Sequence, residues 1–338
     1  MPNRGRTLFT SPDTELMSLT DVLAMLVTDH TLRTVSLGSG LVGVVSGSLG
    51  CYAYLRKQGM MGAIVAHSSL FGITVAFLLG SLIGGRVAPI QFALPGAVFG
   101  GVLSMALVSL IVHSTSIKVD TAMGIALALL FGGGVFLLRI IQSLALPGHR
   151  GLRDYLFGQA ATMTTTDLAT IVGFSAIGLT VVILMWKEFK LHTFDPGFAA
   201  SIGYPMHRLD QLLLATIVLG VVVGLRTVGV ILMVSLLVCP AAAARQWTRR
   251  LGAMMVLAAL FGMLSGVVGA VVSAVVRNLP TGPVISLVAT AWVLVSLVAA
   301  PRRGLVAGAL RRAANRRRFG VMPPDSAVQD RAAAEGEP

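Results

Sequence analysis

Long apolar stretches separated by short polar ones dominate the pattern of hydrophobic and polar positions along this chain. Most come close to the roughly 20 residues that a helix needs to cross about 30 Å of hydrocarbon, whereas barrel strands would be about ten residues of alternating polarity. The pattern therefore predicts an all-α integral membrane protein, built as a polytopic helical bundle. The predicted spans are 33–55, 60–83, 88–113, 121–143, 166–186, 210–240, 252–276 and 283–300.

The sixth of these spans, 210–240, is too long for a single crossing. Gly220, Gly224, Arg226 and Gly229 interrupt its apolar sequence. Irregular backbone is tolerated at membrane depth only where other parts of the protein or a water-filled cavity surround it. We therefore expect one full helix followed by a shorter or re-entrant one, and eight or nine membrane segments in total.

The composition supports a membrane protein and excludes a soluble globular domain. The chain is 55% hydrophobic and 12% charged, with a mean hydropathy of +0.84, whereas about a quarter of the residues of a soluble domain are charged. Three regions follow from the pattern: a polar or amphipathic N-terminal segment (1–30) without an apparent cleavable signal peptide, a transmembrane domain (31–301), and a tail (302–338) that is basic and then disordered.

Basic residues predict the orientation of the bundle. The net charge is +12, and seven of the 26 Lys and Arg residues lie between Arg302 and Arg318, directly after the last span. This cluster indicates a cytoplasmic anchor that favours anionic membrane lipid, and not a nucleic-acid site. The basic connections near Arg56, Lys187 and Arg249 are expected on the same side.

Two polar connections contain helix signals, and the second of them, 239–251, resembles a docking element. In the first, Asp195 followed by Pro196 is typical of a helix N-terminus and Gly203 of a helix end, so a short cytoplasmic helix is expected. In the second, Pro240 opens an alanine-rich helix that ends in the cations Arg249 and Arg250. A third connection, 152–159, is too aromatic for a simple linker.

Enzymatic function is not expected from this sequence. It contains no glycine-rich phosphate-binding loop of the type that ends in Lys-Ser or Lys-Thr. Paired carboxylates, a nucleophile beside a base, and clusters of histidines are also missing from the pattern. Cys51 and Cys239 each lie in or beside an apolar span and do not suggest a disulfide framework.

From about residue 31 to residue 318, a set of short motifs is similar to one known family. These motifs are LRKQ (55–58), IKVDTAMG (117–124), DYLFG (154–158), FDP (194–196), VGV (228–230), PAA (240–242) and LPTGP (279–283). Together they resemble the manganese, zinc and iron permeases of the ATP-binding cassette (ABC) superfamily, in the long form with a basic C-terminal tail.

The resemblance implies a function and a set of partners. Region 31–301 would be the permease domain of an ATP-driven importer of a divalent metal ion, manganese or zinc with iron as a further candidate. The implied partners are a second permease subunit in a homodimer or heterodimer, a cytoplasmic ATP-binding subunit that hydrolyses ATP, and an extracytoplasmic metal-binding protein. No permanently bound cofactor is implied, and the location would be the bacterial inner (cell) membrane.

The resemblance also points to His67 as a metal ligand in the translocation path. The family usually has glycine-aspartate-alanine-x-x-histidine where this chain has GAIVAH at 62–67. Aspartate and histidine four residues apart lie on one helix face and can meet one divalent cation. Here Ala63 occupies the aspartate position, and Phe71 stands where a proline is common.

Several alternatives remain open at His67. The imidazole can instead be a packed side chain bonded to a neighbouring hydroxyl or carbonyl, with Ser68 and Ser69 as the nearest hydroxyls. Sulfur ligands are a further alternative, although methionine in an apolar helix usually fills the core. The sulfur candidates are Met60, Met61, Met233 and Cys239.

The resemblance implies that the helix after the PAA motif couples the permease to the ATPase. The candidate coupling residues are Pro240, Ala241, Ala242, Ala243, Arg245, Arg249 and Arg250. Two other functions remain alternatives. One is a proton-coupled secondary transporter, for which His67 and Arg226 are the main ionisable residues within the spans. The other is a permease of the same family whose substrate has changed because Ala63 replaces the acid.

Overall fold

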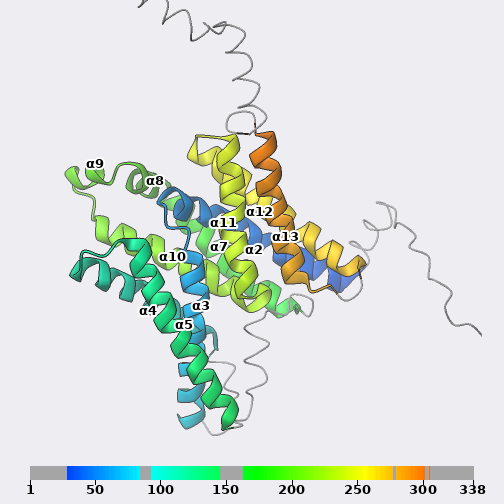
Figure 1. The fold of residues 1–338 in the computed structure, drawn as a ribbon. Helices are drawn as coiled ribbons and strands as arrows, with labels where there is room; N and C mark the ends of the chain where they lie inside the picture. Colours follow the sequence, from blue (N-terminus) through cyan, green and yellow to red (C-terminus); the bar gives the residue numbers. More distant parts are fainter. Residues whose placement is uncertain (1–28, 84–92, 145–162, 277–278, 301–303, 305–338) are drawn as a thin grey trace, which may run out of the picture.

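The structure, a computed structural model, describes residues 29–83, 93–144, 163–276, 279–300 and 304, without the side chains of 226–228, 230 and 231. The regular elements of these described residues are all helices. Figure 1 shows their arrangement. The helices are α2 (His30–Leu55), α3 (Met61–Ile83), α4 (Ala93–Ser114), α5 (Val119–Ser143), α7 (Thr165–Leu184), α8 (Trp186–Phe194), α9 (Pro196–Ser201), α10 (Met206–Val228), α11 (Val230–Trp247), α12 (Leu251–Val275) and α13 (Thr281–Ala299).

Eight of these helices are long and apolar enough to cross a membrane, and α11 contains a shorter apolar helix at Leu232–Trp247. The predicted polytopic all-α membrane fold is therefore confirmed. Most of the predicted N-terminal segment, the aromatic connection 152–159 and nearly all of the tail 302–338 lie outside the described residues.

The long apolar segment 210–240 forms two helices, as its glycines predicted. Gly229 ends α10 and begins α11 with φ 83° and ψ 168°. A residue with a side chain rarely adopts this backbone conformation, whereas glycine adopts it readily. The second helix, α11, then runs parallel to the candidate span α13, because Ser235 pairs with Ser286 and Cys239 with Thr290.

Helix α2 forms the centre of the bundle, where α10, α11 and α12 pack against it (Figure 1). The helix that packs most extensively against it is α12, and a Cβ atom added at Gly43 would lie 2.1 Å from the carbonyl oxygen of Gly262. Next to this contact, Ser39 Oγ donates a hydrogen bond to the carbonyl oxygen of Gly266 at 3.0 Å. Small residues allow the two backbones to approach closely in a way that larger side chains would prevent.

We expect Gly43→Val to separate α2 from α12 and to destabilise the bundle. Forcing a larger side chain into a tightly packed interface costs about 1 to 3 kcal/mol. The matched control is Gly173→Val in α7, where an added Cβ has nothing within 4 Å and the same β-branched residue enters a helix. Thermal unfolding of both purified variants measures the difference. Equal melting temperatures would contradict close α2–α12 packing.

Helices α3, α4 and α5 form a second group that extends away from α11 and α13, toward the bottom of Figure 1. Ser69 Oγ on α3 donates to its own helix at the carbonyl of Val65 (2.7 Å) and across to the carbonyl of Ala97 on α4 (3.2 Å). Helix α4 therefore covers one side of α3, and α5 lies against another. This arrangement determines which face of α3 stays accessible.

Candidate functional site

One stripe of α3 remains partly accessible, and His67 lies in its middle. Between Met61 and Thr74, all residues of this helix are buried except Ala63, His67 and Phe71, which are half-buried. These three residues are four positions apart, so they share one helix face. The predicted pairing of position 63 with His67 on a single face is therefore present in the structure, with alanine at position 63.

The imidazole of His67 packs against α5. Its ring meets the ring of Phe131 edge to face, with the centroids 4.9 Å apart and the planes at 72°. Phe131 itself is 40% exposed, so the pair lies at the edge of the described bundle and not inside it. His67 is thus oriented by an aromatic neighbour and keeps one side open.

The neighbouring hydroxyls do not bond His67. Ser69 Oγ donates to the two carbonyls of α3 and α4 described above. Ser68 Oγ is buried and has no hydrogen-bond partner among the described residues. The alternative of a histidine bonded to Ser68 or Ser69 therefore has no hydrogen bond to support it.

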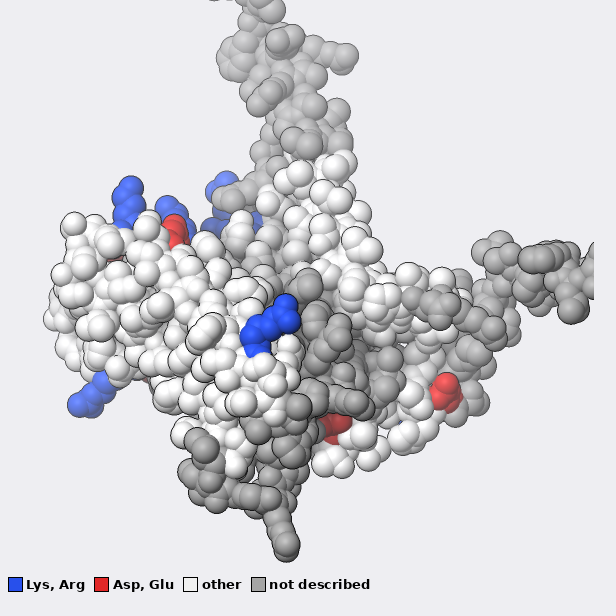
Figure 2. All heavy atoms as spheres, turned by 60° about the horizontal axis from the view of Figure 1, so that its bottom comes forward, with Lys and Arg blue, Asp and Glu red and all other residues white. Residues whose placement is uncertain are grey.

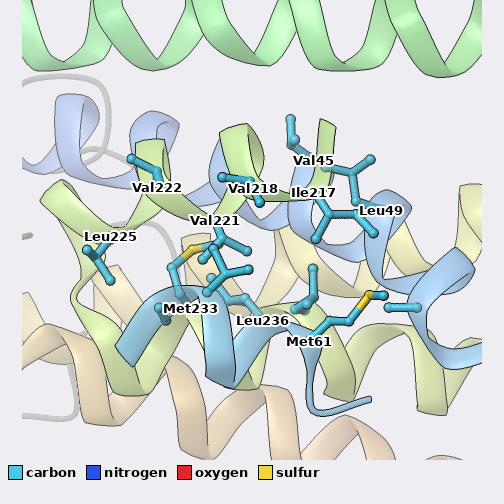
Figure 3. Close-up of a cluster of buried hydrophobic side chains, with 14 of the residues drawn as sticks. Val45, Leu49, Met61, Ile217, Val218, Val221, Val222, Leu225, Met233 and Leu236 are labelled. Atoms are coloured by element: carbon cyan, nitrogen blue, oxygen red, sulfur yellow. The ribbon is translucent and has the colours of Figure 1, made fainter. Parts of the chain in front are cut away.

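The sulfur candidates belong mainly to the apolar core. Figure 3 shows Met61 and Met233 among Val221, Leu236 and other buried side chains from several helices. Met60 is 42% exposed, and Cys239 Sγ lies 4.0 Å from Thr290 Oγ1 on α13. Met61 and Met233 thus fill space in the core, which is the usual role of methionine in an apolar helix.

The described residues contain no group of three or more His, Cys, Asp and Glu side chains that could hold a metal ion. A complete metal site at His67 would need ligands beyond this set, such as water, a hydroxyl oxygen or a group from another chain. The open side of the α3 stripe is where such ligands can approach.

The helix that follows Pro240 is embedded in the bundle. Pro240 lies inside α11 and is buried, and Ala241, Ala243 and Ala244 have no exposed surface. Ala242 and Arg245 are half-buried, and only Arg249 and Arg250 among the predicted coupling residues are exposed.

The end of α11 is tied to its neighbours as well. Trp247 Nε1 donates to Ser296 Oγ on α13 at 3.0 Å, and Arg245 Nη1 donates to the carbonyl of Arg249 at 3.3 Å. The surface that this segment offers to another protein is therefore a short turn and not a free helix.

A more prominent surface lies on α8 and α9, at the upper left of Figure 1. Asp195 caps α9 by accepting from Phe198 N at 3.0 Å, Pro196 occupies its first turn, and Gly203 has a φ of 86°. The capping signals in the sequence are therefore confirmed, although the segment forms two helices, α8 and α9, and not one.

This segment has a buried side and an apolar exposed side. Phe189 and Ala199 have no exposed surface and attach it to the bundle. The exposed side carries four large side chains that we call the aromatic patch: Phe194 (53% exposed), Phe198 (54%), Ile202 (53%) and Tyr204 (37%). Phe194 ends α8, and Phe198 and Ile202 lie in and directly after α9; large apolar residues in a short connection outside the predicted spans are the sequence signal from which the patch could have been predicted.

Basic side chains are unevenly distributed over the face shown in Figure 2. Several blue Lys and Arg side chains gather at the upper left, the side on which α8 and α9 lie, with one red acidic group among them, whereas two other red groups lie toward the bottom and the right. This asymmetry agrees with a cytoplasmic position for the aromatic patch. The basic cluster from Arg302 to Arg318 lies outside the described residues.

A family model described as the ABC 3 transport family matches residues 28–300, which is most of the chain. The chain belongs to the ABC 3 transport family. A similar curated relative is the manganese transport system membrane protein MntC of Bacillus subtilis, 43% identical over 281 residues. That match covers 83% of this chain but only 63% of the relative, so the chain spans less than two thirds of that protein.

Two further comparisons extend along nearly the full length of the matched proteins. The zinc transport system membrane protein TroC of Treponema pallidum is 42% identical over 290 residues, covering 86% of this chain and 96% of TroC. The solved structure of PsaBC from Streptococcus pneumoniae in complex with Fab matches with a TM-score of 0.72 and 28% identity, covering 85% of this chain and 98% of that chain.

Membership of the ABC 3 transport family confirms several predictions. The chain is a multi-pass protein of the bacterial cell membrane and a membrane component of an ABC transport system, not an enzyme. The family resemblance that the motifs suggested is also correct.

Proposed function

We propose that this chain is the permease subunit of an ATP-driven importer of divalent metal ions, with manganese or zinc as the substrate. The observation that carries the proposal is that relatives more than 40% identical are named for manganese and for zinc transport. A relative at 31% identity, from Yersinia pestis, is named for chelated iron, which keeps iron as a further candidate. ATP hydrolysis is assigned to a separate cytoplasmic subunit.

In this proposal His67 contributes to the metal path along the open stripe of α3. Imidazole nitrogen is a ligand that zinc accepts readily, whereas manganese prefers oxygen. With Ala63 in place of an acid, the stripe lacks the oxygen ligand that the family pattern supplies. This favours zinc over manganese, and it is also the observation that favours the second candidate, a permease of the same family with an altered substrate.

A second permease subunit, identical or related, would complete the path. Beside the His67 stripe, α5 exposes the large apolar side chains Leu129 (62%), Phe131 (40%) and Phe136 (67%). In a membrane such a face meets either lipid or another helix. A partner helix packed here would cover the open side of His67 and could add the ligands that the described residues of one chain do not supply.

The ATP-binding subunit would dock on the aromatic patch of α8 and α9. Contiguous exposed apolar side chains outside the spans mark interaction surfaces, and the neighbouring Lys187 and Lys190 are exposed cations. The exposed Arg249 and Arg250 at the α11–α12 turn would lie at the edge of this interface. Pro240, Ala241 and Ala243, which the sequence suggested as coupling residues, are then structural support for that turn.

We expect cells that carry the permease, the ATP-binding subunit and the extracytoplasmic metal-binding protein to accumulate radioactive manganese or zinc. Omitting the ATP-binding subunit should remove this accumulation, because the permease has no energy source of its own. Collapsing the proton gradient while ATP is held constant should have little effect. Accumulation that survives without the ATPase and stops with the proton gradient would instead identify a proton-coupled secondary transporter.

A further inference from the structure

We propose that Asp210 is a positioning residue that transmits movement of α8 and α9 to α2 and α10 during transport. The inference rests on the proposed function, in which the ATPase docks on the aromatic patch. It concerns a different part of the molecule, the polar junction beneath that patch, where α2, α8 and α10 meet.

Asp210 joins three helices through one carboxylate oxygen. Arg56 Nη2, at the end of α2, lies 2.5 Å from Asp210 Oδ1. His192 Nε2, near the end of α8, lies 3.2 Å from the same oxygen. Asp210 itself is in the first turns of α10. A shift of α8 must therefore either move this oxygen or break one of its two hydrogen bonds.

The second contact between α8 and α2 is aromatic and lies close to the first. Phe189 of α8 meets Tyr52 of α2 edge to face, with ring centroids 5.8 Å apart, and both side chains are fully buried. Tyr52 and Arg56 are one helical turn apart on α2, as are Phe189 and His192 on α8. The two helices therefore meet along matching faces, with Asp210 at one end of the contact.

The polar groups around this junction are only partly satisfied. Of the buried side-chain atoms without a hydrogen-bond partner among the described residues, five belong to α2, the turn that follows it, or α8: Tyr52 Oη, Arg56 Nη1, Gln58 Oε1, Glu188 Oε2 and His192 Nδ1. Gln58 and Asp210 line one cavity of about 120 Å³, together with His113. The set contains groups of both α2 and α8, so it offers alternative partners when the helices shift.

These unpaired groups are the second reason for the assignment. Buried polar atoms are nearly always hydrogen-bonded in a resting structure, and exceptions require an explanation. A network of hydrogen-bonding groups that has one set of pairs in one state and another set in a second state is bistable. Coupling between distant sites requires such a two-state element. Arg56 Nη1 on α2 supplies an unused donor to such a network, and Glu188 Oε2 on α8 supplies an unused acceptor.

Simple stabilisation of the fold does not explain the junction equally well. The side chain of Asp210 is 35% exposed and that of Arg56 is 17% exposed. Ion pairs that water reaches contribute little to stability. The two contacts of Asp210 nevertheless set the geometry of the junction, because one carboxylate fixes the relative positions of α2, α8 and α10.

The test replaces both charges by apolar side chains, in the variant Arg56→Met with Asp210→Leu. Removing both charges together avoids leaving either of them unpaired, and the further loss is the hydrogen bond between Asp210 and His192 Nε2, so the fold should be retained. The variant is reconstituted in proteoliposomes with the ATP-binding subunit and the metal-binding protein. Zinc uptake and ATP hydrolysis are measured together, and the thermal stability of the complex is recorded.

We expect the double variant to bind the ATP-binding subunit and to support ATP hydrolysis. It should transport roughly tenfold less zinc per ATP than the unmodified protein, and a tenfold change lies within the usual range of coupling effects. The matched control is Asp120→Asn, an exposed acid in the first turn of α5, which should keep the normal ratio.

An unchanged ratio of zinc to ATP in the double variant would overturn the proposal. Loss of the folded complex would also overturn it, because the junction would then be a determinant of folding. Failure of the unmodified protein to transport any metal would instead contradict the proposed function, so the two failures are distinguishable.

Discussion

Replacing Phe198 with aspartate is expected to abolish ATP-driven transport by separating the ATP-binding subunit from the permease. Phe198 is 54% exposed at the centre of the aromatic patch, and only its backbone N–H takes part in the Asp195 cap. Aspartate is favourable in the first turn of a helix, so α9 should remain folded. Burying a carboxylate at the interface should weaken binding by about 3 kcal/mol, roughly a hundredfold.

Co-purification of the ATP-binding subunit with tagged permease, and stimulation of its ATPase activity, measure the effect of Phe198→Asp. The comparison variant is Arg249→Glu with Arg250→Glu, which changes the exposed charges of the α11–α12 turn and leaves the patch intact. It should weaken stimulation less than Phe198→Asp does. If only the arginine variant loses the ATPase, docking takes place at the α11–α12 turn, as the sequence pattern suggested.

Features that depend on local sequence were predictable. The lengths of the apolar stretches indicated the number of helices, because bilayer thickness sets the length of a span. Glycines predicted that the segment 210–240 would divide into two helices, and the break lies at one of them, Gly229, whose backbone conformation few other residues adopt. Asp195, Pro196 and Gly203 marked the ends of α9 for the same kind of local reason.

Features that depend on distant neighbours were not predictable. Proline, four alanines and an arginine suit an exposed helix and a tightly packed one equally well, so the sequence could not reveal that Ala241 and Ala243 are buried. The contact of Trp247 with Ser296 spans 49 residues of sequence. Arg56 and Asp210 are 154 residues apart, and no local pattern indicates which arginine an acid will meet.

The second large effect is expected at the open stripe of α3. Ala63→Asp should create a tighter metal site with His67, and His67→Ala should abolish the metal binding that the unmodified permease retains. A carboxylate and an imidazole four residues apart on one face can bind a single divalent cation, as in the paired ligands of metalloprotease helices. Position 63 is half-buried, unlike Ile64, Val65 and Ala66, so the new acid does not enter the core.

The affinity for manganese should rise more than that for zinc, because the added ligand is an oxygen. We expect a gain of about tenfold or more for manganese, equivalent to roughly 1.4 kcal/mol. Without metal the acid should lower the melting temperature, and saturating metal should restore it, because a ligand that binds only the folded state stabilises it.

The matched control is Ala63→Asn, in which asparagine has nearly the same shape as aspartate and no charge. Calorimetric titrations with both metals, together with melting temperatures, separate the two interpretations of His67. If Ala63→Asp and Ala63→Asn behave alike and His67→Ala binds metal as the unmodified protein does, His67 is a packing partner of Phe131 and the metal path follows another face.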